Sequence, residues 1–316
     1  MNIAYSCNDY YIPQTGISII SLCENNKDID EIIIYFIGKD VSKENVGILR
    51  NLTERYNRKF EYIDFDSIAY DLNISAIGRH IETIYAKVFF SRIEGMDKII
   101  YLDSDTVVTG SLAPLWDEDL SDSYMGVVQT FSKNKAELGI LESEPFFKDG
   151  MAIVNVDYCR KNHLTEKVLK VIDEYNGNPP TLSEGALNKV CQGHIKYISL
   201  RWNCMAGILY FARLDVKELA KDLDQYSLYD IKDSCENPVV IHYLTAFYNR
   251  PWFVPCSHPY KDCYSHYKSL SPWKDVKPIY KPLPIRIRCI DLCYKIFGFR
   301  ITNIVRNILN GVRFSN

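Results

Sequence analysis

Short apolar runs alternate with longer amphipathic segments through the first hundred residues, and this alternation limits the fold more than any other feature of the sequence. The runs Asn2–Ser6, Glu31–Ile37 and Phe60–Phe65 are rich in β-branched and aromatic residues, which favours strands. Between them, the spacing of apolar residues predicts helices over Tyr11–Glu24 and Ser42–Tyr56, the second with Ser42 as its N-cap. Strands that alternate with helices build βαβ units, so we predict an α/β domain with a parallel sheet.

The run KIIYL at Lys98–Leu102 is apolar enough to lie in the centre of that sheet, and a helix is expected just before it at Ile81–Phe90. Beyond Trp116 the pattern becomes mixed. The remaining expected elements are strands at Tyr124–Val128, Met151–Val156 and Val239–His242, and a helix at Leu164–Tyr175. Residues 251–284 are rich in Pro, Tyr and His, so we expect loops and short helices that wrap one side of a site.

Composition is that of a folded protein: 47% of the 316 residues are hydrophobic and 24% are charged, which suits one catalytic domain over residues 1–280. The formal net charge of −3 gives no reason to expect nucleic-acid binding.

The chain has ten cysteines but no CxxC pair, and its start lacks a secretory signal. These features predict reduced thiols in the cytoplasm. Four of them lie in apolar segments and are expected to be small buried residues: Cys7, Cys23, Cys159 and Cys191.

The C-terminal tail, residues 281–316, has seven basic residues and one acid, Asp291. Its apolar residues follow helical spacing: Ile290, Cys293, Phe297, Ile301, Ile304 and Ile308. Such a helix either packs on its own domain with its arginines in water, or binds an anionic membrane surface. No run reaches the roughly 18 to 20 apolar residues of a membrane span.

A DxD pattern, Asp103-Ser104-Asp105, directly follows the strand KIIYL. Ligands of open α/β sheets bind beyond the carboxyl ends of strands. Two carboxylates two residues apart can hold one hard cation and leave its other positions to phosphate oxygens. The alternative is a pair of solvated loop acids, with Asp105 near Thr106 and Ser111. The apolar strand before the motif and the segment SLAPLWD after it favour the metal site.

His242 also lies at a predicted strand end, because it follows the apolar residues 238–241. A mixed carboxylate and imidazole ligand set suits manganese better than calcium. A metal ion on a diphosphate would stabilise the charge that a nucleotide-sugar leaving group gains as the glycosidic bond breaks. The alternative for His242 is an ordinary hydrogen-bonded core imidazole.

The sequence resembles glycosyltransferase family 8, which includes glycogenin and bacterial lipopolysaccharide galactosyltransferases and glucosyltransferases. The resemblance runs from Asn2 to about Trp252 and is carried by NIAYSCNDYY, IYAKVFF, KIIYLDSDTVVTGSLAPLWDEDL, DGMAIVNVDYCRKN, SEGALN and VVIHYLTAFYNRPW. The long block is the most specific. The resemblance implies a Rossmann-like GT-A fold with a mixed, mainly parallel central sheet, and transfer with retention of the anomeric configuration.

By this resemblance, Asp103, Asp105 and His242 match the family's metal ligands. Ser104, between the two acids, is counted with the residues that contact the donor. Asn8 and Tyr11 match the loop that holds the nucleobase, with Tyr11 stacked on uracil; the alternative is a polar turn with a half-buried tyrosine.

Three further positions match residues of the family's donor site. Lys87 matches a basic residue near the donor's phosphate or sugar, against the alternative of a solvated helix charge. Thr130 is expected in a loop that faces donor sugar and acceptor, or in an ordinary loop. Arg250 can offer a forked donor to phosphate, or be a surface arginine.

The chain also departs from the family pattern. Lys148, Asp149 and Gly150 stand where relatives commonly have Asn-Ala-Gly, which places opposite charges beside the donor sugar. Ser183-Glu184-Gly185 replaces Asp-Gln-Asp, so Glu184 occupies the position nearest the reacting sugar carbon. We therefore predict Glu184 and Asp149 as catalytic residues. The alternative for Glu184 is an acid in the first turn of a helix capped by Ser183.

A third departure lies after the histidine, where the usual His-x-x-Gly and Lys-Pro-Trp appear as His242 to Thr245 and then Arg250, Pro251 and Trp252. It leaves the diphosphate contacts of this loop open.

These observations predict a cytoplasmic, membrane-associated retaining glycosyltransferase that uses Mn²⁺ or Mg²⁺. Its expected donor is UDP-galactose or UDP-glucose. Its expected acceptor is a glycan or lipid-linked saccharide of surface polysaccharide or lipopolysaccharide synthesis. One alternative is a catalytically silent relative that binds nucleotide sugar or glycan. A weaker one is a phosphohydrolase that uses Asp103.

Overall fold

The computed structural model describes residues 1–75, 82–132 and 134–311, with the backbone alone at 300 and 303–311. The described chain forms a central seven-stranded sheet with the order β3-β2-β1-β4-β7-β6-β8. Its strands are β1 (Asn2–Cys7), β2 (Ile33–Gly38), β3 (Lys59–Asp64), β4 (Lys98–Leu102), β6 (Met125–Thr130), β7 (Phe146–Asn155) and β8 (Ile195–Tyr197).

The sheet is mixed and mainly parallel, as predicted. Strand β1 pairs in parallel with β2 and β4, β2 with β3, and β6 with β8, whereas β7 runs antiparallel to β4 and β6. Strand β4 lies in the middle of the order, which confirms the central position expected for KIIYL. A parallel strand that is covered on both faces must be apolar throughout.

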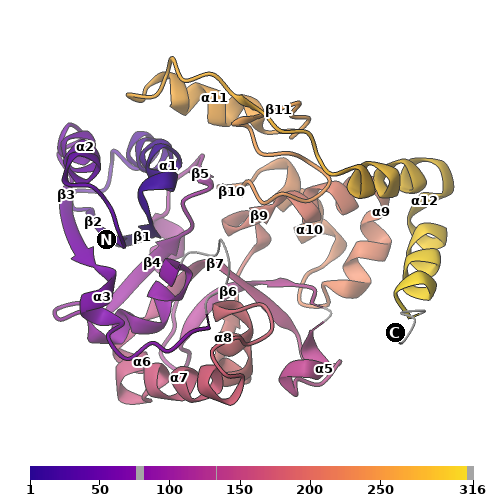
Figure 1. Cartoon of the computed structure of the whole chain (residues 1–316), viewed down its shortest axis with the longest axis horizontal. Coiled ribbons are helices and arrows are strands. Elements are labelled where there is room, and N and C mark those ends of the chain that lie inside the picture. Colours follow the sequence, from indigo (N-terminus) through magenta and orange to yellow (C-terminus); the bar gives the residue numbers. More distant parts are fainter. Residues whose placement is uncertain (76–81, 133, 312–316) are drawn as a thin grey trace.

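Helices cover the two faces of the sheet, and each face has its own buried core (Figure 1). One core includes residues of α1 (Ile12–Glu24) and α2 (Lys43–Glu54). The other includes residues of the 3₁₀ helix η2 (Glu82–Arg92), α6 (Val156–Lys161), α7 (Leu164–Glu174) and α8 (Ser183–Cys191). Shorter elements are η1 (Asp9–Tyr11), α3 (Phe65–Ile68), α4 (Ala113–Trp116), α5 (Lys135–Leu138) and η3 (Leu200–Trp202).

A small sheet with the order β5-β10-β9 positions the site. Its strands are β5 (Thr106–Val108), β9 (Cys204–Met205) and β10 (Val240–His242). Strand β5 follows the DxD segment directly, and β10 pairs antiparallel with it so that His242 stands opposite Thr106. This register is what brings the histidine to the two acids.

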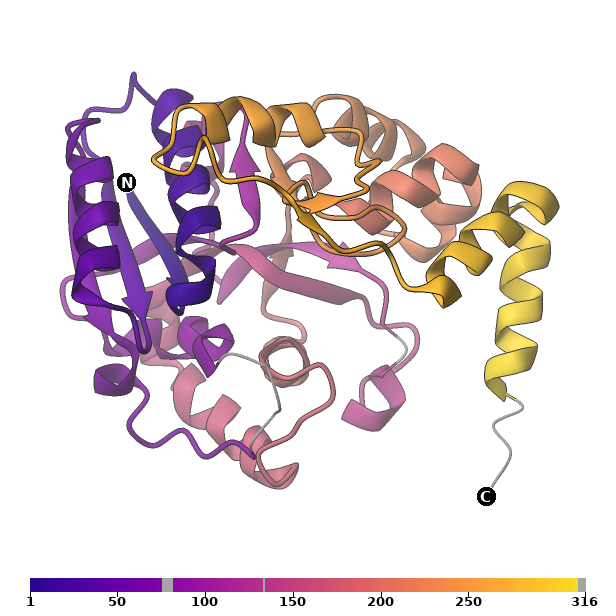
Figure 2. The same ribbon diagram turned by 45° about the horizontal axis from the view of Figure 1, so that its top comes forward.

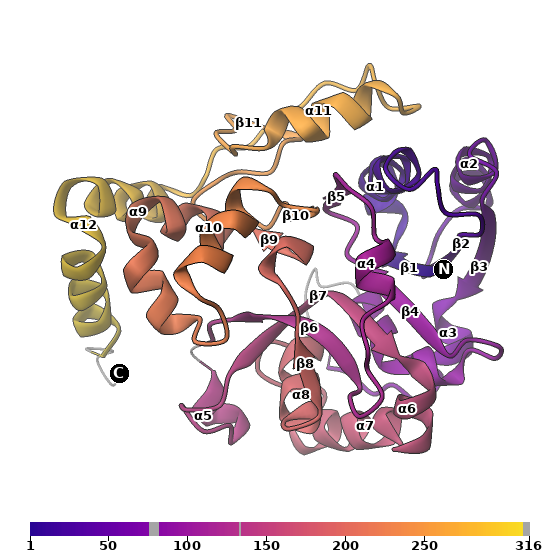
Figure 3. The same cartoon turned by 180° about the vertical axis from the view of Figure 1, so that it is seen from behind.

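The C-terminal third contributes α9 (Ala206–Asp222), α10 (Leu228–Glu236), β11 (Phe253–Val254), α11 (Lys261–Ser269), β12 (Ile279–Tyr280) and α12 (Ile285–Gly311). Helices α9 and α10 are seen on one side of the sheet in the view from behind (Figure 3). The segment with α11 lies beside α1, whereas the C-terminal part of α12 extends away from the body of the molecule (Figure 2).

Helix α12 is kinked at Gly298, whose φ of 74° is left-handed. Before the kink it packs on α9: Tyr294 is buried among the aromatic rings of Tyr210 and Phe211, and the hydroxyl of Tyr210 donates to Asp291 at 2.7 Å. The tail stripe is divided by this packing, since Phe297 remains exposed. The division of the chain after residue 280 stays a prediction.

Several boundaries differ from the sequence prediction. Phe65 begins α3 instead of ending β3, and Ile81 lies outside the described residues. Strand β7 begins at Phe146, not Met151, because the polar segment 148–150 continues the strand with a register irregularity against β6. Helices α9 and α10 were not predicted.

None of the helices among the described residues combines the length and apolar character that crossing a bilayer requires.

The cysteine predictions are confirmed for burial: Cys7, Cys23, Cys159 and Cys191 are buried and free. Ser42 caps α2 as expected, since its side chain accepts from the amide of Asn45.

Candidate metal and donor site

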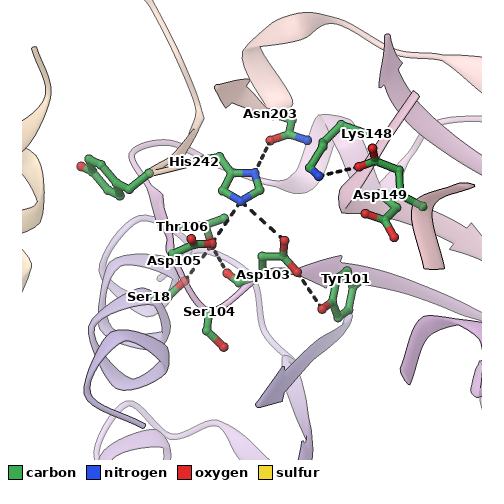
Figure 4. A network of polar contacts seen from close by, with 12 residues as sticks. Ser18, Tyr101, Asp103, Ser104, Asp105, Thr106, Lys148, Asp149, Asn203 and His242 are labelled. Carbon is green, nitrogen blue, oxygen red and sulfur yellow. Dashed lines mark hydrogen bonds and ion pairs between the residues drawn. The ribbon is translucent and has the colours of Figure 1, made fainter. Parts of the chain in front are cut away.

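The two acids of the DxD segment lie where β4 ends and β5 begins (Figure 4). The amide of Asp103 donates to the carbonyl of Gly150 on β7 at 2.8 Å, which ties the segment to the neighbouring strand. The hydroxyl of Tyr101 donates to Oδ1 of Asp103 at 2.8 Å. That contact leaves Oδ2 of Asp103 directed toward His242, 3.5 Å from its Nε2.

His242 completes a cluster in which one ligand atom from each of three residues lies within 4.8 Å of the others. Its Nε2 is 3.0 Å from Oδ1 of Asp105 and its Nδ1 is 2.9 Å from Oδ1 of Asn203. An amide oxygen can only accept, so Asn203 holds the proton on Nδ1 and leaves the lone pair of Nε2 toward the carboxylates. This is the orientation that a metal-binding imidazole needs.

Two observations indicate that these residues fit a divalent cation. Nε2 of His242 is buried and finds no hydrogen-bond partner among the described residues. An unsatisfied buried nitrogen of this kind costs free energy unless something binds it. A Cβ at Gly150 would lie 2.3 Å from Oδ2 of Asp103 and 2.5 Å from Cε1 of His242. Only glycine therefore leaves this side of the cluster open.

Asp105 is shared between the histidine and an arginine. Nη2 of Arg250 lies 2.8 Å from its Oδ2, so the two oxygens face different partners. Burial works to raise the pKa of Asp105, but its charged and hydrogen-bonding neighbours, Arg250 among them, outweigh it and hold that pKa below its usual value. The carboxylate is thus kept ionised, as a metal ligand must be.

Arg250 also connects this cluster to the first strand's loop. Its Nη1 donates to the hydroxyl of Tyr11 at 3.0 Å and its Nε to the carbonyl of Tyr243 at 3.1 Å. Tyr11, Arg250 and both acids line one cavity of about 280 Å³. The sequence did not predict this contact between Arg250 and Asp105, and no pattern in the sequence signals it.

The other first-loop and DxD residues have mainly structural partners. Asn8 caps the turn of η1, since its Oδ1 accepts from the amide of Tyr10 at 3.1 Å. The hydroxyl of Ser104 is buried, accepts from Thr15 at 2.9 Å and donates to the carbonyl of Ser6 at 3.3 Å. Ser104 lines the same cavity.

Two ion pairs lie beyond the cluster, and both use residues that depart from the family pattern. Lys87 Nζ is 2.9 Å from Oδ2 of Asp149, and their side chains are only 5% and 7% exposed. Ser183 donates to the same oxygen at 2.8 Å. Lys148 pairs with Glu184, whose side chain is 12% exposed.

The two acids of these pairs respond differently to burial. Burial works to raise the pKa of Asp149, but Lys87 and Lys148 outweigh it and lower that pKa. For Glu184 burial dominates and, although Lys148 opposes it, raises the pKa to about 7. Glu184 therefore exchanges its proton near neutrality, whereas Asp149 stays ionised.

Three interpretations of this region are wrong. Ser183 does not cap α8: the N-cap is Leu182, without a side-chain cap bond, because the Ser183 hydroxyl is used by Asp149. Thr130 is not in a loop but ends β6, and it lines a separate cavity with Asp224 and Lys135. Lys87 is a buried ion-pair member and not a solvated charge.

The profile of Glycosyl transferase family 8 matches residues 2–254 of the chain. General stress protein A of Bacillus subtilis (strain 168) is 24% identical over 284 residues, which span 87% of this chain and 96% of that protein. A lipopolysaccharide 1,2-glucosyltransferase of Escherichia coli is 24% identical over 286 residues, 87% of this chain and 80% of that protein.

Among solved structures, the galactosyltransferase LgtC in complex with donor and acceptor sugar analogues matches with a TM-score of 0.70 and 20% identity. The match covers 92% of this chain and 99% of that one. GlyE of Streptococcus pneumoniae TIGR4 matches with a TM-score of 0.61 and 20% identity, over 87% of this chain and 61% of that one. These likenesses establish the GT-A fold that the sequence predicted.

Proposed function

Because the chain belongs to glycosyl transferase family 8, we propose that it transfers galactose or glucose from a UDP-sugar to a glycan acceptor, with retention of configuration and with Mn²⁺ or Mg²⁺. The observation that carries this proposal is the buried Nε2 of His242, which finds no hydrogen-bond partner among the described residues and faces Asp103 and Asp105. One imidazole and two carboxylates fit a divalent ion, and an ion held there would have further positions for diphosphate oxygens.

The donor would lie in the cavity of about 280 Å³ beside these ligands. Tyr11 offers its ring to the uracil, and Arg250 offers a planar guanidinium to the diphosphate. In the structure that guanidinium contacts Asp105 and Tyr11, so phosphate would have to share it or displace one of these partners. Asn8 and Ser104 would shape the loop and the floor of the nucleotide site. A bound ion would act as a Lewis acid on the leaving diphosphate.

Glu184 is our proposed catalytic residue. A carboxylate can stabilise an oxocarbenium-like sugar carbon or attack it, and both roles need the ionised form. Lys148 pairs with Glu184 and favours that form, although burial opposes it. Transfer on one face of the sugar, without an enzyme nucleophile, remains the alternative to double displacement through Glu184.

Asp149 is better proposed as a positioning residue than as a reacting one. Its Oδ2 already accepts from both Lys87 and Ser183, and its pKa is lowered, so it is not free to take up a proton. Its role would be to hold Lys87 and to keep a second positive charge, Lys148, near the donor site.

The acceptor is proposed to be a glycan or lipid-linked saccharide of surface polysaccharide or lipopolysaccharide synthesis, acted on in the cytoplasm at the inner face of the membrane. The lipopolysaccharide 1,2-glucosyltransferase of Escherichia coli, a relative over 87% of this chain, supports this acceptor class. The basic tail supports a peripheral position, since Leu292, Ile296 and Phe297 are exposed on α12 beside basic residues.

The test is UDP release from UDP-galactose and UDP-glucose, with and without Mn²⁺, by the wild type and Asp105→Ala. Asp173→Ala, an exposed acid on α7, is the matched control. We expect release that depends on Mn²⁺, is lost in Asp105→Ala and is kept in the control. Equal release under all conditions would refute the proposal.

The second candidate is a relative that binds nucleotide sugar but transfers nothing, which the altered residues Lys148, Ser183 and Thr245 motivate. Calorimetry with UDP and Mn²⁺, together with the release assay, distinguishes the two: the silent relative binds UDP and never turns over.

A further inference from the structure

A second cavity, of about 420 Å³, lies between α1 and the segment that carries α11. It contains none of the residues of the metal cluster. Its walls are largely apolar and include Pro13 and Ile17 of α1, Tyr264 of α11, and both Trp252 and Trp273. A cavity of this size is within the range of about 300 to 1,000 Å³ that binds small ligands.

One wall of the cavity is a tryptophan that packs closely on α1. A Cβ at Gly16 would lie 2.3 Å from the ring of Trp273, so that ring rests directly on the backbone of α1. Trp273 therefore bounds the cavity on the side of α1.

Three lysines surround this apolar space, and none of the described residues that line it is acidic. Lys268 has a structural use, because its Nζ donates to the carbonyls of Lys274 at 3.0 Å and Val276 at 2.6 Å. These two hydrogen bonds fix the turn that carries Lys274 and Lys277. Lys274 and Lys277 are exposed and form no ion pair with a described residue. The cavity thus combines an apolar interior with two uncommitted positive charges at its edge.

The surface around the cavity has the same character. Large apolar side chains point into solvent along the segment, and they include Leu270, Val276, Ile279, Tyr280 and Ile285. Residues 270–288 contain five basic residues and one acid, Asp275. Exposed apolar residues so close together are unusual on a soluble surface and mark a binding site. With cations between them, they suit an anionic bilayer.

We propose that this cavity binds one anionic phospholipid of the bilayer, with an acyl chain between α1 and α11 and the phosphate held by Lys274 and Lys277. Charge complementarity supports a phosphate headgroup, and the apolar walls support an aliphatic chain. The inference deepens the peripheral membrane position in the proposed function. It differs from that position because it names a bound lipid and a site outside the α12 tail.

The site would also orient the enzyme. Tyr10 and Trp252 line the lipid cavity, and their neighbours Tyr11 and Arg250 line the donor cavity. A lipid bound here places the bilayer surface next to the donor site, where a lipid-linked acceptor would arrive.

The experiment uses the full chain and vesicles of phosphatidylglycerol with brominated acyl chains, which quench tryptophan fluorescence at close range. The chain has four tryptophans, and two of them line the cavity. We expect quenching that falls by at least half in Trp273→Phe. Lys274→Glu/Lys277→Glu should need at least tenfold more lipid for the same quenching, because two positive charges proposed to bind the phosphate become negative. Vesicles of brominated phosphatidylcholine should quench several-fold less.

One control and one further variant separate lipid binding in this cavity from general charge effects and from membrane binding by α12. Lys170→Glu/Lys232→Glu changes the net charge equally on α7 and α10 and should bind lipid like the wild type. Ser269→Phe narrows the cavity without changing the charge and should reduce quenching. The variant should still sediment with vesicles, because α12 would still bind the membrane. Circular dichroism checks the fold of each variant.

The proposal is overturned if quenching is the same in Trp273→Phe, if the two lysine double variants behave alike, or if phosphatidylcholine quenches equally. UDP release without lipid, measured in parallel, keeps the outcomes apart: a protein that binds lipid but releases no UDP contradicts the proposed activity and not this site.

Discussion

Nε2 of His242 lies 3.0 Å from Oδ1 of Asp105, and the second oxygen of that carboxylate is held by Arg250 at 2.8 Å. One carboxylate therefore joins the proposed metal site to the proposed diphosphate site. Removal of either partner would leave the buried carboxylate of Asp105 with only one partner, which is destabilising.

Asn203→Leu is expected to lower the affinity for Mn²⁺ by about 10- to 100-fold, because the histidine loses the acceptor that fixes its tautomer and ring orientation. Mn²⁺ titration of UDP release measures this. Excess Mn²⁺ should restore release in Asn203→Leu and not in Asp105→Ala. Equal Mn²⁺ dependence of wild type and Asn203→Leu would contradict the role of Asn203.

Gly150→Ala is expected to abolish Mn²⁺-dependent release, because the new methyl group would overlap Oδ2 of Asp103 and Cε1 of His242. Gly47→Ala on α2 is the matched control, since a Cβ there meets nothing within 4 Å. That control should keep full activity and gain up to about 1 kcal/mol of stability, as alanine favours a helix. Calorimetry with Mn²⁺ and UDP gives the affinity of both variants.

Lys87→Met should lower the free energy of unfolding by about 3 to 5 kcal/mol, because Asp149 would remain buried without its partner. Lys59→Met removes an exposed pair with Glu31 and should change the free energy of unfolding far less than Lys87→Met does. Urea denaturation measures both. The double variant Lys87→Met/Asp149→Leu should recover most of the loss, and its failure to do so would point to a role of Lys87 apart from this pair.

Turnover should fall as the pH drops through about 7, because burial raises the pKa of Glu184 to about 7 and the proposed role needs the carboxylate. Below that pH the loss should approach about tenfold per unit, as for a single proton. Lys148→Met removes the cation that opposes the shift, so the pKa rises further and the acid limb moves to higher pH. Lys148→Arg should restore the limb, and Glu184→Gln should lack it. An identical limb in Glu184→Gln would assign the titration to another group.

Local patterns were sufficient for much of the fold. The run Lys98–Leu102 was predicted as a central strand and is one, since a parallel strand covered on both faces is apolar throughout. The same holds for β1 and α1, whose ends are within one residue of the prediction. Strand β7 was placed too late because Lys148 and Asp149 are polar, and their ion pairs, which compensate for that polarity, are not visible in the chain.

The sequence by itself determined the α/β class and the family, and it predicted three candidate metal ligands, because short motifs and apolar periodicity are local properties. Only the tertiary structure decided how those ligands are supported. The register of β10 on β5 sets His242 among the acids, and Asn203 comes from a segment whose local sequence carries no sign of the site. Arg250 was expected at the donor site, but its contact with Asp105 was visible only in the structure. The partners of Asp149 and Glu184 were decided in the same way, since contacts between distant residues depend on packing and not on spacing along the chain.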